Sequence, residues 1–70
     1  MKEVVTNRVQ ELRSKAEITQ EALASAVGVT RQTIIAVEKG NYTPSVHLAL
    51  KISKFFKKQL EEIFSISYEK

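Results

Sequence analysis

Residues 20–39 have the sequence QEALASAVGVTRQTIIAVEK, which carries the clearest structural signal in the chain. Thr19 precedes it as a predicted N-cap, because a threonine side chain can accept a hydrogen bond from a free amide in the first turn of a helix. Gly28 ends the first apolar repeat, as a glycine just past a helix does. Thr30 then caps a second helix that runs to about residue 39. The stretch therefore predicts two short helices separated by a tight turn.

The spacing inside this stretch predicts how the two helices pack. Ala24 falls where they cross, so a small side chain is needed there, and Gly28 lets the backbone turn four residues later. Ile34 and Val37 are the expected inward anchors of the second helix, as Leu23 and Val27 are of the first. Small, glycine, apolar and apolar residues at these offsets indicate a helix-turn-helix over residues 19–39.

Three more helices are predicted around this motif. The first covers about residues 7–15, with Asn7 as its N-cap and Gln10 completing a weak capping box. A fourth begins near Pro44 and Ser45 and ends near residue 56, and a fifth covers about residues 59–64. The turn between these last two lacks glycine, so Lys57 or Lys58 must take the left-handed conformation. The expected core positions of the three helices are Val9, Leu12, Ala16, Val46, Ala49, Leu50, Ile52, Phe56, Leu60 and Ile63.

The two ends of the chain carry strand-like patterns. Residues 2–6 are β-prone, and residues 64–68, FSISY, alternate apolar and polar side chains. The ends can pair as a short β ribbon, within one chain or across a dimer, or they can fray. We therefore expect an all-α domain of five helices with a core over residues 7–64, and the ribbon remains one of two alternatives.

Two opposite charges border the predicted core. Arg13 comes four residues after Val9, and Glu38 comes four residues after Ile34, so each charge lies beside an apolar stripe. A charge near a core needs a partner. We expect Arg13 and Glu38 to form an ion pair that ties the first helix to the third.

Composition excludes several function classes. The chain has 70 residues, enough for one domain, and 11 basic against 8 acidic residues give a net charge of +3, which mildly favours a polyanionic partner. It has no cysteine and one histidine, so we expect no metal site, no cofactor and no enzyme activity. Its N-terminus lacks the apolar segment of a secretory signal. We expect no membrane partner and a location in a prokaryotic cytoplasm or nucleoid.

The motif extends to a family resemblance. Arg13, residues 19–24 (TQEALA), residues 27–34 (VGVTRQTI), residues 38–40 (EKG) and Pro44-Ser45 resemble the lambda-repressor-like, Cro/C1-type transcriptional regulators over about four-fifths of the chain. The short length and the two ends are similar to small stand-alone repressors of the cytolysin-operon type. That resemblance implies five helices with a terminal β ribbon, and a homodimer. The Arg13–Glu38 pair matches a structural ion pair of the family.

The resemblance also implies a contact surface for duplex DNA. The third helix, about residues 30–39, would enter the major groove, where Arg and Gln side chains can bond to guanine and adenine edges. Gln20 would hold a phosphate or brace the third helix, and residues after that helix would contact phosphates. The expected DNA-binding residues are Gln20, Thr30, Arg31, Gln32, Thr33, Ile35, Ala36, Lys39, Asn41, Tyr42 and Thr43.

Some apolar residues exceed what one small core needs. Phe55, Phe64, Ile66 and Tyr68 are the expected contacts with a twofold mate. A homodimer predicts an inverted-repeat site on DNA, and repression by occupying an operator is the expected output. The alternatives are an antitoxin, a phage or restriction-system control protein of the same fold, or a protein-interaction module without DNA affinity. The sequence shows no small-molecule site.

Overall fold

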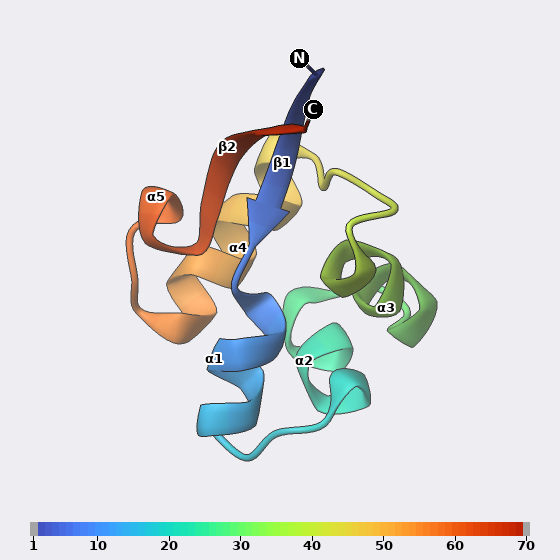
Figure 1. The fold of residues 1–70 in the computed structure, drawn as a ribbon. Helices are drawn as coiled ribbons and strands as arrows, with labels where there is room; N and C mark the ends of the chain where they lie inside the picture. The colour runs from blue at the N-terminus through green and yellow to red at the C-terminus, as the bar shows by residue number, and fades with distance from the viewer. Residues whose placement is uncertain (1, 70) are drawn as a thin grey trace.

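The computed structural model describes residues 2–69, which form five helices and one two-stranded antiparallel sheet. The elements are β1 (Lys2–Asn7), α1 (Val9–Lys15), α2 (Gln20–Val27), α3 (Arg31–Lys39), α4 (Val46–Phe56), α5 (Leu60–Ile63) and β2 (Phe64–Glu69). Figure 1 shows β1 and β2 as a ribbon that projects from the helical part, with both ends of the chain at its tip. The expected five-helix fold with a terminal β ribbon is thus confirmed.

The ribbon joins the two ends of the described chain. Its register pairs Lys2 with Glu69 and continues to Asn7, which pairs with Phe64. The hydroxyls of Thr6 and Ser65 lie 3.0 Å apart across the strands. The pairing forms within one chain, so the fraying alternative is wrong for residues 2–69.

The helix ends follow the predicted capping residues. The Thr19 hydroxyl accepts from the Ala22 amide at 3.0 Å, and Ser45 accepts from the Leu48 amide at 3.1 Å. Gly28 and Gly40 end α2 and α3 in the left-handed conformation, with φ of 75° and 81°. Lys57 ends α4 in the same conformation with φ 56°, as the missing glycine required.

The start of α1 differs from the prediction. The helix begins at Val9, and Asn7 still belongs to β1. Arg8 occupies the N-cap position, and its backbone amide donates to the Ile63 carbonyl at 2.9 Å. The predicted capping box of Asn7 and Gln10 is therefore wrong, because Asn7 remains paired in the strand while its side chain reaches into the helical part.

The core is one cluster contributed by all five helices. Its largest fully buried members are Leu23, Ile34, Ile52, Ile63, Val9 and Val37. Ala16 was expected there but is exposed, because the chain leaves α1 at this residue. Ile18 of the following loop packs against the cluster instead.

The apolar side of α4 was predicted correctly at Ala49 and Ile52 and incorrectly at Val46 and Leu50. Leu48, Ala49 and Ile52 are buried, whereas Val46 and Leu50 are 73% and 49% exposed. Val46 and Leu50 are four residues apart and so share a second side of the helix. That side faces the ribbon, where Val5, Thr43, Pro44, Val46, Ala49, Leu60 and Phe64 line an apolar groove of about 130 Å³. The apolar residues of α4 therefore form two stripes.

Within residues 2–69, none of the helices is long and apolar enough to cross a bilayer. Histidine and acidic side chains of the same residues do not gather in groups of three that could hold a metal ion.

Candidate nucleic-acid interface

The geometry of α2 and α3 follows from their caps and the turn between them. Gly28 turns the chain, and its amide bonds to the Ser25 carbonyl at 3.3 Å. Thr30 then starts α3: its hydroxyl accepts from the Thr33 amide at 3.3 Å and lies 3.1 Å from the Thr33 hydroxyl. The two helices therefore meet at an angle fixed by one short turn, with Ala24 and Val27 buried beside it.

A buried ion pair fixes α3 to α1. Arg13 Nε donates to Glu38 Oε2 at 2.8 Å, and Nη2 reaches Oε1 at 3.3 Å. The two side chains are only 14% and 4% exposed. Arg13 Nη1 also donates to the Ile18 carbonyl at 2.9 Å. The expected Arg13–Glu38 pair is therefore present, and it includes the α1–α2 loop as well.

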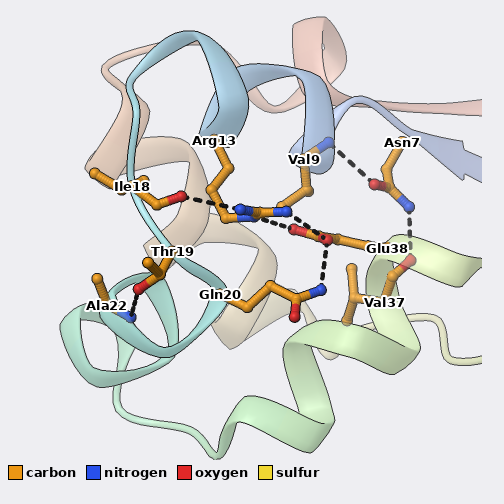
Figure 2. A network of polar contacts seen from close by, with 9 residues as sticks. All are labelled: Asn7, Val9, Arg13, Ile18, Thr19, Gln20, Ala22, Val37 and Glu38. Atoms are coloured by element: carbon orange, nitrogen blue, oxygen red, sulfur yellow. Dashed lines mark hydrogen bonds and ion pairs between the residues drawn. The ribbon is translucent and has the colours of Figure 1, made fainter.

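Gln20 completes this network. Its Nε2 donates to Glu38 Oε1 at 3.0 Å, so the first residue of α2 braces α3 through the same carboxylate (Figure 2). Of the two roles expected for Gln20, bracing is the one visible in the structure. Figure 2 also shows Asn7 bonded to Val9 and to Val37 of α3, a contact that the sequence did not indicate.

The outward side of α3 is polar at its start. Arg31 and Gln32 are exposed, while Thr33, Ile35 and Ala36 are half-buried. The first turn of α3 contains no acidic residue, although acidic residues favour that end of the helix dipole and basic ones oppose it. The positive charge of Arg31 at the start of α3 therefore does not stabilise its own helix. Ile35 is half-buried, so only part of its side chain is exposed.

A concave surface of about 810 Å³ connects the starts of α2 and α3. It is lined by Arg13, Thr19, Gln20, Glu21, Ala22, Ser25 and Arg31. Arg31 of α3 therefore borders the same space as Gln20 and Glu21 of the first turn of α2.

The remaining expected contacts follow the C-terminal end of α3. Lys39, Asn41, Tyr42 and Thr43 are all exposed, and Tyr42 shows 45% of its surface. The structure therefore places the expected residues in two groups, one at each end of α3. Thr30 and Thr33 belong to the first group, but their hydroxyls already bond to each other.

Arg8 and Glu11, whose pKa values are shifted, lie at the start of α1 and away from both groups. The hydrogen bond from Arg8 to Glu11, at 2.7 Å, lowers the pKa of the Glu11 carboxyl, and Lys15 at 3.3 Å adds to the effect. The same pair raises the pKa of Arg8. These exposed charges stabilise the first helix and do not contribute to the concave surface.

Comparison with known proteins identifies this arrangement of helices. The helix-turn-helix family matches residues 9–63, which include all five helices. The chain belongs to the Cro/C1-type helix-turn-helix family. This regulator is similar to the HTH-type transcriptional regulator YgzD of Bacillus subtilis, with 51% identity over 63 residues, 90% of this chain and 96% of that protein.

Two solved structures resemble the regulator. The P22 c2 repressor in complex with a synthetic operator superposes with a TM-score of 0.75 and 30% identity, covering 77% of this chain and 82% of that one. The restriction-modification controller protein C.AhdI of Aeromonas hydrophila gives 0.73 and 31%, covering 79% and 83%. The protein is thus a DNA-binding transcriptional regulator, and its fold is lambda-repressor-like. The members of its family are transcriptional regulators and not enzymes.

Proposed function

We propose that this regulator binds one operator sequence in duplex DNA as a homodimer and represses transcription by occupying it. The observation that carries the proposal is the state of α3. Its inner side is fully buried through Ile34 and Val37 and is braced through Glu38, while Arg31 and Gln32 extend from its first turn. A rigid helix with exposed hydrogen-bonding side chains at its N-terminal end suits the reading of base edges in the major groove.

Each exposed group on α3 has a role in this proposal. Arg31 would bond to guanine and Gln32 to adenine, each contributing about 1–3 kcal/mol of discrimination. Thr33, Ile35 and Ala36 are partly exposed beside them, and the last two are suited to thymine methyl groups. Phosphate contacts are proposed for Gln20, Thr30, Lys39, Asn41, Tyr42 and Thr43, which flank the helix at both ends.

The dimer contact is proposed on the ribbon and the adjoining side of α4. Residues paired directly across an antiparallel ribbon share a face, so Val5 and Ile66 lie together, as do Glu3 and Tyr68. Ile66 and Tyr68 are 63% and 60% exposed, and Val46 is 73% exposed on α4. Phe64 lines the groove between them and also packs against the core.

Phe55 stands apart from this surface. It is nine residues after Val46, or two and a half helical turns, which places it on the opposite side of α4. Its ring lies edge-on to Phe56 with centroids 5.0 Å apart. We therefore restrict the proposed dimer surface to Val5, Val46, Leu50, Phe64, Ile66 and Tyr68.

The proposal is tested by selecting bound duplexes from a random pool at about 150 mM salt, near physiological ionic strength. An enriched inverted repeat is the expected result. Arg31→Ala and Gln32→Ala should each relax the preference at one base position, whereas Lys39→Ala should weaken all duplexes alike and reduce the salt slope by about 1. Lys15→Ala, the same loss of charge on α1, is the control. Recovery of unenriched DNA would contradict the proposal.

Restriction control is a second candidate, favoured by the likeness to C.AhdI. It shares the DNA-binding step and differs in the genes regulated. A reporter driven by the regulator's own upstream region and by neighbouring promoters separates the two. Regulation of an adjacent restriction-modification gene pair would support this candidate, and regulation of other genes would exclude it.

A further inference from the structure

One amide side chain joins the ribbon to two helices. Asn7 is the last residue of β1, and its side chain is half-buried. Its Oδ1 accepts from the Val9 amide at 3.0 Å, and its Nδ2 donates to the Val37 carbonyl at 2.9 Å (Figure 2). The first bond is at the start of α1 and the second is in the last turn of α3.

Both bonds satisfy groups that a helix leaves free. The first amides and last carbonyls of a helix have no partner inside it, and the helix dipole favours an acceptor at the start and a donor at the end. The Val37 carbonyl accepts from the Gly40 amide at 3.0 Å, and Asn7 supplies its second donor. If the amide were rotated by 180°, its Nδ2 would face the Val9 amide and its Oδ1 would face the Val37 carbonyl. Neither of those pairs can form a hydrogen bond, so the contacts fix the orientation of the amide.

The position of Asn7 makes this contact more than a cap. Asn7 pairs with Phe64 at the root of the ribbon, and the next residue, Arg8, bonds through its amide to Ile63 of α5. The neighbouring anchor of α3, Glu38, bonds only to Arg13 and Gln20, so it holds α3 to α1 and α2. Among the hydrogen bonds of residues 2–69, the bond from Asn7 to Val37 is the one that joins α3 to the ribbon.

We infer that Asn7 is a positioning residue that fixes the orientation of α3 relative to the ribbon, and so sets the half-site spacing that the dimer accepts. The inference rests on the proposed function, in which the ribbon carries the dimer contact and α3 carries the base contacts. In that dimer, the hydrogen bond from Asn7 to Val37 in each copy would join α3 to the strand that carries the proposed dimer contact. Loss of the bond from Asn7 to Val37 would leave the contacts of each α3 with its half-site intact but would let the distance between the two α3 helices vary.

The test compares duplexes that carry the selected half-sites at a series of spacings, together with a duplex that carries a single half-site. Asn7→Asp keeps the acceptor for Val9, removes the donor to Val37 and brings a negative charge to the end of α3. Asn7→Ala removes both bonds without adding charge. Thr6→Val is the matched control, because it removes the Thr6–Ser65 contact in the same ribbon and leaves α3 untouched.

We expect the unmodified protein and Thr6→Val to prefer one spacing. Asn7→Asp should bind that spacing about five- to tenfold more weakly, the effect of one lost hydrogen bond to a buried group, and should bind neighbouring spacings almost as well. Its affinity for the single half-site should stay within about twofold, because Glu38 still braces α3. Asn7→Ala should show the same flattened profile, so the result does not depend on the new charge or on the folding of one variant.

Two results would overturn the inference. One is an unchanged spacing profile in both Asn7 variants, with any loss of affinity equal on full and single sites. That result would make Asn7 a purely structural cap and would leave dimeric binding intact. The other is a protein that shows no spacing preference before any substitution, which would refute the proposed dimer itself.

Discussion

Individual residues in unusual backbone conformations mark where this chain is strained. Glu17 and Lys57 have φ values of 57° and 56°, in the left-handed region that suits glycine. The sequence pointed to Lys57 or Lys58, because the turn after the fourth helix lacks a glycine. It gave no such sign for Glu17, where the chain closes α1 with one amide bonded to the Ser14 carbonyl. Each conformation costs about 1–2 kcal/mol in an L-residue.

Lys57→Gly should therefore stabilise the protein. Relief of the left-handed strain is partly offset by the greater freedom of glycine in the unfolded chain, which leaves a gain of about 0.5–1 kcal/mol. Urea denaturation measures it. Lys58→Gly removes the same charge at a position without positive φ, and it should give no gain. Equal effects of the two substitutions would exclude strain as the cause.

Removal of one member of the Arg13–Glu38 pair should lower the free energy of unfolding strongly, whereas replacement of both members by apolar residues should change it much less. Arg13→Met leaves a carboxylate that is 4% exposed with Gln20 as its remaining side-chain donor, and removing one member of a buried pair costs about 3–5 kcal/mol. The double variant Arg13→Met with Glu38→Leu removes both charges and should recover most of that loss. Chemical denaturation of the four proteins in the cycle measures this. Additive losses would show that the two residues act independently.

Among the helices and strands, the parts with local signals were predictable. The caps Thr19, Thr30 and Ser45 and the two glycines are local signals, so α2, α3 and the start of α4 were placed correctly. The orientation of α4 depends on what covers its sides, and its two apolar stripes give the same helical period. The bond from Asn7 to Val37 joins residues 30 positions apart, and nothing in the spacing of either residue shows it.

The orientation of α4 in the structure predicts different losses of stability when Leu48 and Val46 are each replaced by alanine. Leu48→Ala removes a side chain that is 5% exposed and should cost about 2–5 kcal/mol. Val46→Ala truncates one that is 73% exposed and should cost under about 0.5 kcal/mol. Thermal unfolding at low protein concentration, where self-association contributes least, measures both. A large loss of stability from Val46→Ala alone would show that Val46 belongs to the core, as the sequence predicted.

As a folded unit, the regulator has two proposed contact surfaces. One is the outward side of α3, which carries the proposed base contacts, and the other is the apolar ribbon face with Val46 and Leu50. A domain of this size has a thin margin of stability, about 0.05–0.15 kcal/mol per residue. Burial of the apolar face in a dimer would add to it, because association stabilises the folded state.

Self-association should depend on the ribbon face and not on Phe55. Ile66→Lys places a charge in the proposed contact and should give a monomer in sedimentation experiments, with weaker binding to the inverted repeat. Phe55→Lys makes the same change on the opposite side of α4 and should leave the dimer intact. A dimer that survives Ile66→Lys and dissociates on Phe55→Lys would move the interface to the other side of α4.

The pairing of β1 with β2 has a consequence for synthesis on the ribosome. During synthesis β1 has no partner until β2 emerges, since Asn7 pairs with Phe64. At translation rates of about 5–20 residues per second, β1 waits roughly 3–11 s. During that interval residues 2–7 remain unpaired, while α2, α3 and α4 are synthesised one after another. A truncated product that lacks β2 would leave β1 without its partner strand, and an unpaired strand edge is a template for aggregation.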